Sequence, residues 1–201
     1  TVAMPKTLRT FIALPLSENM TDQIAAVQHT LRRTCPERVI RWVAPAGIHL
    51  TLFFLGDILP ERVQPVQQAL SVVTRYVQPF TFTVQGAGAF PNVNRPRVVW
   101  LGLNEATGRL ALLHQAINEA MEKVGFQPET RRFSPHLTLG RVQRKASYDE
   151  ARAVGQAVVQ ADVGYLGEVC AEEVIFFRSV LKSSGAEYTP LETFRFKGAE
   201  Q

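Results

Sequence analysis

The chain has 201 residues, of which 46% are hydrophobic and 20% charged, and its net charge is +4. These values fit an ordinary globular protein with one good-sized core, or with two small lobes that share a core. The absence of any apolar run of about 20 residues excludes a helical membrane span. Two cysteines, Cys35 and Cys170, are too few for a disulfide framework, and because they are far apart and neither is in a Cys-x-x-Cys pair, a structural zinc site is disfavoured. The basic excess suits a polyanionic partner such as nucleic acid without demanding one. The segment Thr1–Lys6 lacks signal-peptide features, so we expect a cytoplasmic protein.

Strands and helices are predicted from hydrophobic spacing and from the positions of Pro, Gly and capping residues. In chain order we first expect a strand over 7–14, a helix from Ser17 to about Arg33, strands over 39–43 and 48–56, and a helix opened by Pro60. Strands over 80–84 and 98–103 follow, with a loop at 86–91 between them, and then a helix from Glu105 to about Val124. The last part is expected to form a strand over 133–141, a helix over 148–160, and closing strands over 169–181 and 187–196 around a turn at 183–185.

This order lacks a strict strand–helix–strand alternation. It favours an α+β fold with antiparallel pairing over a doubly wound parallel sheet. No linker-like or low-complexity segment interrupts the chain. We therefore expect residues 1–201 to form a single domain.

The tetrapeptide His-Leu-Thr-Leu occurs twice, at His49–Leu52 and His136–Leu139. A proline precedes each copy, at Pro45 and Pro135, and a predicted helix follows each. Such an echo indicates an old duplication of a strand–helix unit. Each half would then supply one strand to a shared site.

The alternation of side chains along a strand predicts which residues of each tetrad lie on the same face. Side chains at positions i and i+2 lie on one face, so His49 and Thr51 share a face, as do His136 and Thr138. The leucines between them would face the core. If the two halves pack around a pseudo-twofold axis, two imidazoles and two hydroxyls converge.

That set of groups suits phosphoryl chemistry. Histidine titrates near neutral pH, so one ring can take a proton from an attacking water while the other gives a proton to the leaving oxygen. Threonine hydroxyls can donate hydrogen bonds to phosphate oxygens as charge accumulates on them. No metal is required for this scheme.

Other arrangements fit the sequence less well. A catalytic zinc site typically has three protein ligands, and Asp57 is the single carboxylate beside either tetrad. A Ser-His-Asp hydrolase is disfavoured because no Gly-x-Ser-x-Gly elbow is present. The remaining histidines, His29 and His114, lie in predicted helices without an echo of each other, and we interpret them as structural.

The two motifs, 48–56 and 134–141, resemble those of the 2H phosphoesterase superfamily, which is named for its paired His-x-Thr/Ser motifs. The longer likeness, which includes 9–13, 99–103 and the segment from Tyr188, is to the RNA 2′,3′-cyclic phosphodiesterases, historically called 2′-5′ RNA ligases. The resemblance implies a bilobal pseudo-twofold fold, with two antiparallel sheets lining a central cleft and helices outside. It also implies an RNA 2′,3′-cyclic phosphate end as substrate.

Roles for individual residues follow from the resemblance. It implies that His49 is the proton donor, that His136 is the proton acceptor, and that Thr51 and Thr138 hold the phosphate. It implies hydrolysis to a 2′-phosphomonoester without cofactor or metal, and 2′-5′ joining of RNA ends by the reverse reaction. Nothing in the sequence signals an oligomer, so a monomer is the default expectation.

Arg141 directly follows the second motif and is a candidate phosphate ligand. Simple alternation puts it on the face opposite His136, unless a bulge or the strand end turns it inward. Candidates for contacts to the RNA backbone are Arg41, Arg131 and Arg132. Candidates for stacking on a base are Phe11, Phe53 and Tyr188, among which Phe53 shares the predicted face of His49.

Two alternatives remain open from the sequence. The same site would suit a small cyclic nucleotide, such as ADP-ribose 1″,2″-cyclic phosphate, or a 2′-5′ oligonucleotide. The second alternative is a module that binds nucleotide or RNA without catalysis, although binding alone would not need both an acid and a base.

Overall fold

The computed structural model describes residues 6–182 and 185–198, so most of the segment tested for a signal peptide and two residues of the expected 183–185 turn lie outside the described residues. The elements in chain order are β1 Leu8–Leu14, α1 Glu18–Thr34, β2 Ile40–Trp42, the short 3₁₀ helix η1 Pro45–Gly47, β3 Leu50–Ile58, η2 Pro60–Arg62, α2 Val63–Arg75, β4 Phe80–Phe90, β5 Val98–Asn104, α3 Arg109–Lys123, β6 His136–Val142, α4 Tyr148–Gln160, β7 Tyr165–Ala171, β8 Glu173–Lys182 and β9 Gly185–Arg195.

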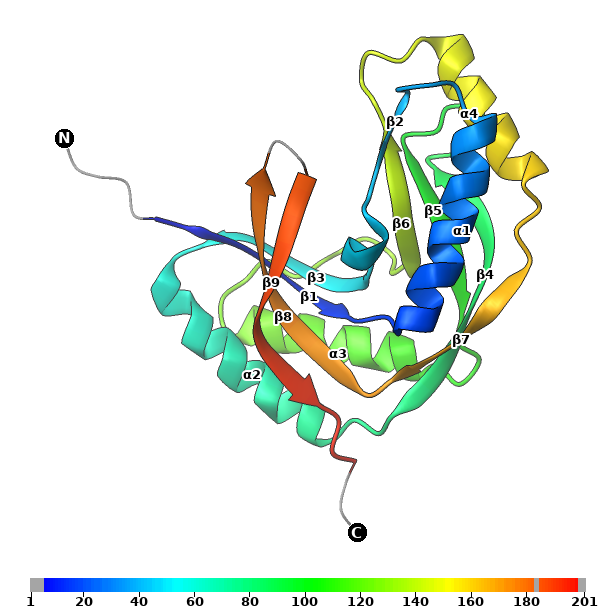
Figure 1. The fold of residues 1–201 in the computed structure, drawn as a ribbon. Helices are drawn as coiled ribbons and strands as arrows, with labels where there is room; N and C mark the ends of the chain where they lie inside the picture. The colour runs from blue at the N-terminus through cyan, green and yellow to red at the C-terminus, as the bar shows by residue number, and fades with distance from the viewer. Residues whose placement is uncertain (1–5, 183–184, 199–201) are drawn as a thin grey trace, which may run out of the picture.

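The strands form two antiparallel sheets (Figure 1). The first, sheet A, has the order β3-β1-β8-β9, and the second, sheet B, has the order β2-β6-β5-β4-β7. The chain begins in sheet A with β1, adds β2 to sheet B, and returns to sheet A with β3. It then builds the rest of sheet B with β4 to β7 and ends in sheet A with β8 and β9. The first tetrad lies at the start of β3 and the second in β6, so each sheet carries one copy. The predicted α+β class with two antiparallel sheets is confirmed.

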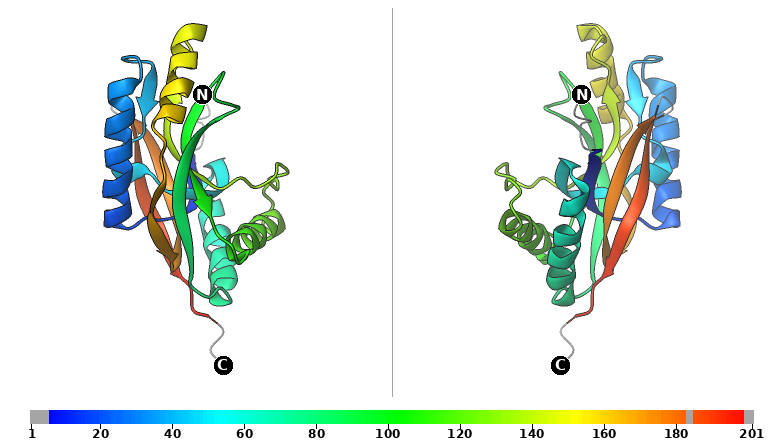
Figure 2. Two further views of the ribbon diagram at one scale, coloured as in Figure 1. Left: turned by 90° about the vertical axis from the view of Figure 1, so that its right-hand side faces the viewer. Right: turned by 90° about the vertical axis from the view of Figure 1, so that its left-hand side faces the viewer.

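Helices cover the outer face of each sheet. The α2 and α3 helices pack on each other and on sheet A, whereas α1 and α4 pack on each other and on sheet B. Figure 1 shows that the uncovered faces of the two sheets turn toward each other, and Figure 2 shows α1 and α4 side by side. We call these uncovered faces the inner faces. No helix among residues 6–182 and 185–198 is long and apolar enough to cross a membrane.

Local signals explain the helices that matter for the site. Ser17 caps α1, its hydroxyl accepting from the backbone N–H of Met20 at 3.3 Å, and apolar residues spaced along α1 bury one face. At α4, Ser147 and Glu150 form a reciprocal capping box. Both predicted helix starts are confirmed. The predicted helix from Glu105 begins instead at Arg109, because Glu105 accepts hydrogen bonds from Thr107 and Leu110 in a preceding turn.

Two strand predictions were wrong. The segment 86–90, expected as a loop, continues β4, because its small residues let the indole of Trp100 lie across the strand. A Cβ at Gly88 would lie 2.4 Å from that ring. The expected single strand over 169–181 is two strands, β7 and β8, which belong to different sheets. Continuous apolar runs do not reveal where a chain crosses between sheets.

Candidate active site

His49 lies immediately before β3, one residue short of the strand in which it was predicted. Three aromatic rings surround its imidazole on the inner face of sheet A. The centroid distances are 4.6 Å to Phe11, 5.1 Å to Tyr188 and 5.8 Å to Phe177. Phe11 and Tyr188 were predicted as candidates for base contacts, and in the structure both rings pack on His49, with Phe11 buried and Tyr188 half-buried. Phe177 was missed, and its place follows only from the pairing of β8 with β1.

Enclosure by these rings changes the acidity of His49. Burial lowers the pKa of His49 from 6.5 to about 4, and a hydrogen bond to the backbone of Gly47 opposes that shift. The imidazole of the free protein is therefore neutral near pH 7. A neutral ring can accept a proton directly, whereas it must first gain a proton in order to donate one.

The lowered pKa of His49 predicts acid sensitivity. Between pH 6.5 and about 4 the unfolded chain binds a proton at this residue and the folded chain does not, so stability falls as pH falls through that window. The loss at pH 4 should reach about 3 kcal/mol at most. Urea unfolding at pH 7.5 and pH 4.5 measures it. His49→Asn should weaken the pH dependence, whereas the same change at exposed His29 should not. Equal pH dependence in the two variants would contradict the burial argument.

His136 is the first residue of β6 on the inner face of sheet B. Its Nδ1 lies 2.7 Å from the carbonyl oxygen of Ser134. A carbonyl can only accept, so Nδ1 carries a hydrogen, and in the neutral form of the ring the lone pair is on Nε2. The ring of Phe90 stands edge-on at 4.9 Å. Each histidine thus bonds to the backbone two residues before it, at Gly47 and at Ser134.

The threonines occupy the inner faces beside the histidines. Thr51 lies opposite Ala13 of β1, on the side of Phe11, and Thr138 lies opposite Trp100 of β5. Trp100 in turn contacts Phe90, whose ring also contacts His136. Both threonines are half-buried. The i and i+2 relation predicted for each tetrad is therefore consistent with the observed register.

A β-bulge ends each tetrad at the same position. In β3 the register passes from Thr51 to Phe53 and skips Leu52, and in β6 it passes from Thr138 to Gly140 and skips Leu139. The bulge reverses the alternation that follows it. The residue five positions after each histidine therefore returns to the inner face.

Arg141 is the residue that the second bulge returns. It lies opposite Val98 of β5, two residues before Trp100, and so shares the face of Thr138. The register thus places Arg141 on the inner face. Simple alternation would have put it on the opposite face, and the bulge at Leu139 turns it inward. Burial raises the pKa of Tyr188, and the positive charges of Arg141 and Arg9 oppose that shift. Arg141 of sheet B therefore lies close enough to Tyr188 of sheet A to act on it electrostatically, and β3 contacts β6.

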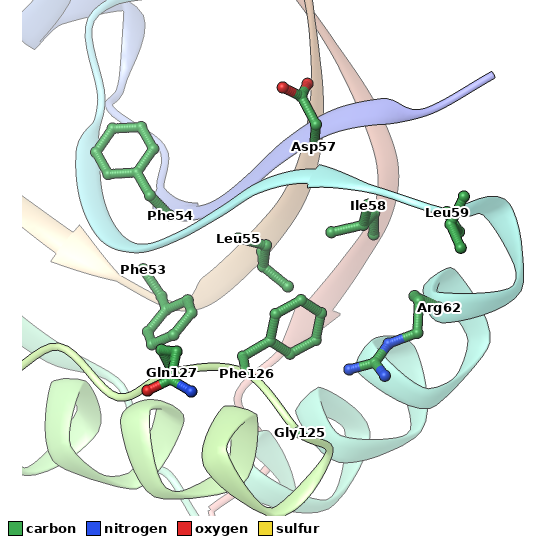
Figure 3. Close-up of a pocket in the computed structure, with 10 residues that line it drawn as sticks. All are labelled: Phe53, Phe54, Leu55, Asp57, Ile58, Leu59, Arg62, Gly125, Phe126 and Gln127. Carbon is green, nitrogen blue, oxygen red and sulfur yellow. The ribbon is translucent and has the colours of Figure 1, made fainter. Parts of the chain in front are cut away.

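Phe53 does not lie on the inner face, contrary to the prediction that it shares the face of His49. The bulge at Leu52 sets Phe53 opposite Ile12 in the core, where it is 5% exposed. Figure 3 shows Phe53 and Leu55 pointing toward the helices, into a pocket of about 500 Å³, while Phe54 points to the other side of the strand. Phe54, which is 66% exposed and stands 6.0 Å from the ring of Phe11, is the aromatic residue that the bulge turns inward.

Gln28 of α1 joins the backbones of the two tetrad segments. Its Nε2 donates to the carbonyl of Val43 at 2.8 Å and to the carbonyl of the bulged Leu139 at 2.9 Å. Val43 leads into η1 and His49, and its own N–H also donates to Leu139 at 2.9 Å. Gln28 is 2% exposed. The sequence prediction did not identify Gln28. Its position as a polar residue among the apolar residues of the buried face of α1 was the feature that could have indicated a structural role.

Gln28→Leu is expected to destabilise the fold by about 1–3 kcal/mol, because it leaves the buried carbonyl of Val43 without a donor. Chemical denaturation at neutral pH measures this loss. The matched control is Gln23→Leu, the same substitution at an exposed position of the same helix, which should change stability by less than about 0.5 kcal/mol. Equal effects of the two substitutions would show that the bridge contributes nothing.

Two of the arginine candidates lie in the segment that leads into β6. Arg131 and Arg132 are exposed in the segment between α3 and β6, and Arg131 pairs with Glu129 at 3.1 Å. The ring of His114 stacks on Phe133 at 3.8 Å and so packs on the same segment. Among residues 6–182 and 185–198, no three His, Cys, Asp or Glu side chains gather in a way that could hold a metal ion.

Solved structures share this architecture. The chain resembles the crystal structure of TT0787 of Thermus thermophilus with a TM-score of 0.79 at 28% identity, covering 96% of this chain and 100% of the other. It resembles Escherichia coli LigT complexed with 3′-AMP with a TM-score of 0.70 at 26% identity, covering 94% and 98%. The fold is thus that of a LigT-type phosphoesterase.

Sequence comparison agrees. Residues 14–100 and 101–161 match the family described as LigT like Phosphoesterase. The chain is 32% identical to the RNA 2′,3′-cyclic phosphodiesterase of Methanothermobacter thermautotrophicus, over 94% of this chain and 98% of the relative. It is 31% identical to the enzyme of the same name from Thermotoga maritima, over 95% and 97%. The chain belongs to the LigT-like phosphoesterase family.

Proposed function

We propose that this protein hydrolyses RNA 2′,3′-cyclic phosphate ends to 2′-phosphomonoesters by acid–base catalysis between His49 and His136. The observation that carries the proposal is the pair of tetrads, one on each inner face, with the same bulge after each threonine. The names of the relatives, RNA 2′,3′-cyclic phosphodiesterase, support the choice of substrate.

In the proposed reaction, Nε2 of His136 removes a proton from a water molecule, whose oxygen attacks phosphorus. The bond from phosphorus to the 3′ oxygen breaks, and His49 gives that oxygen a proton. The 2′ ester bond remains, which accounts for a 2′-phosphomonoester as product. The hydrogen bond from Nδ1 of His136 to Ser134 is compatible with the acceptor role, because in the neutral ring it places the lone pair on Nε2.

The donor role of His49 requires that the substrate change its acidity. In the free protein, burial holds the pKa of His49 at about 4. A bound phosphate anion next to the ring favours the charged form and raises the pKa. His49 would then be protonated only when a substrate is present to receive the proton.

The hydroxyls of Thr51 and Thr138 and the guanidinium of Arg141 would hold the phosphate. Hydroxyl and guanidinium groups both donate to phosphate oxygens, and Arg141 adds a positive charge on the same face as Thr138. Charge on those oxygens increases in the transition state, so donors fixed there accelerate the reaction. An RNA 5′-hydroxyl in the place of the water would give 2′-5′ joining by the same steps.

The test is an assay of an oligoribonucleotide that ends in a 2′,3′-cyclic phosphate, with the product isomer identified. We expect a 2′-phosphomonoester and undiminished activity after exhaustive EDTA treatment. Formation of a 3′-phosphomonoester would contradict the assignment of the leaving oxygen. Turnover of a small cyclic nucleotide without any turnover of RNA ends would contradict the choice of substrate, and binding without turnover would contradict catalysis.

A further inference from the structure

Sheet B carries two arginines side by side on its inner face. Arg41 is the middle residue of the edge strand β2 and lies directly opposite Arg141 of β6. The residues before and after it face the helices: Ile40 is buried, and the guanidinium of Arg32 in α1 lies 5.1 Å from the ring of Trp42. Alternation therefore turns Arg41 to the inner face, next to Arg141.

The positive charges of this pair are not compensated by the protein. Cβ atoms of directly opposite residues stand about 4.5–5.5 Å apart, and like charges at that position are destabilising. Both arginines are exposed, and over the described ranges 6–182 and 185–198 neither forms an ion pair with a carboxylate. An anion bound between them would offset the repulsion, and the guanidinium fork is well suited to phosphate.

The two arginines stand at different distances from the tetrads. Arg141 follows Thr138 on the same strand and acts electrostatically on Tyr188, whose ring contacts His49. Arg41 is one strand further out, at a strand spacing of about 4.8 Å, on the edge of the sheet. A polyanion that extends from the tetrads along this face therefore passes Arg141 first and then Arg41.

We propose that Arg41, beside Arg141, binds the phosphodiester next to the reacting cyclic phosphate, and so makes an oligoribonucleotide a better substrate than a cyclic mononucleotide. This inference rests on the proposed function and specifies its substrate class. A cyclic mononucleotide carries one phosphate, which the tetrads and Arg141 hold. Only a longer RNA presents a second phosphate to Arg41.

The experiment compares kcat/KM for two substrates, a short oligoribonucleotide with a 2′,3′-cyclic phosphate end and adenosine 2′,3′-cyclic phosphate. Arg41→Ala should lower the value for the oligonucleotide by about tenfold and leave that for the mononucleotide unchanged. It should also reduce the salt dependence of oligonucleotide binding by about one unit of slope. Arg141→Ala should lower both values, and Arg41→Lys should restore part of the loss by keeping the charge.

Arg75→Ala is the matched control, since Arg75 is exposed in the last turn of α2 and its removal changes net charge equally. It should alter neither substrate. An equal loss on both substrates for Arg41→Ala would overturn the proposal. Unchanged kinetics accompanied by aggregation would also overturn it, and would assign Arg41 to protection of the edge strand. If the unmodified protein hydrolysed neither substrate, the proposed function would fail first and take this inference with it.

Discussion

His136→Ala is expected to lower kcat/KM for an RNA 2′,3′-cyclic phosphate by about 10²–10⁴-fold, since it removes the proposed general base. His49→Ala should cause a loss of the same order by removing the proposed acid. Affinity for a non-reacting 2′-phosphorylated oligonucleotide should change much less, because the threonines and arginines remain. Steady-state kinetics together with fluorescence titration separate the two effects.

His29→Ala is the control, because His29 is exposed on α1 and lies outside the site. It should retain full activity. The double variant of His49 and His136 should be little slower than either single variant, since the two groups act in one step. Full activity of His136→Ala would refute the base assignment. Strictly additive losses would indicate that the histidines act in separate steps.

Thr138→Val and Thr51→Val are the second pair of changes, each expected to lower kcat by about 10²–10³-fold. Valine keeps the β-branched shape of threonine and removes only the hydroxyl donor. The loss should fall on kcat more than on KM, because the phosphate oxygens carry most charge in the transition state. Rapid-mixing measurements of single turnover report the chemical step directly.

The matched control for these changes is Thr81→Val in β4, where the side chain is exposed near the edge of sheet B. It should leave kcat unchanged. A rise in KM without any fall in kcat for both tetrad threonines would mean that they bind the ground state and the transition state equally. That result would exclude the threonines from transition-state stabilisation.

Much of the site follows from the sequence alone. The repeated tetrad, read with strand alternation, predicts that each threonine shares a face with its histidine, and the register is consistent with that pairing. It also predicts two related halves, and two antiparallel sheets each carry one copy. The repeat provides this information because two copies of one pattern predict two similar strand segments, although His49 lies just before β3 and His136 is the first residue of β6.

Prediction from the sequence was wrong where a β-bulge interrupts the regular alternation of side chains along a strand. A bulge at Leu52 and at Leu139 shifts the alternation by one residue, which buries Phe53 and brings Phe54 and Arg141 to the inner face. Nothing in the apolar sequence around these two leucines indicates that the alternation shifts there. Partners from distant strands, such as Phe177 beside His49, depend on strand order, which the sequence of one strand does not encode.

Both tetrads are proposed to act on one phosphate, and a crystal structure with a 2′-phosphorylated oligoribonucleotide tests this most directly. We expect a single phosphate within hydrogen-bond distance of His49 and His136, with the hydroxyls of Thr51 and Thr138 on its oxygens. A phosphate held by one tetrad alone, or bound instead in the pocket on the outer face of β3 near Arg62, would contradict the shared site.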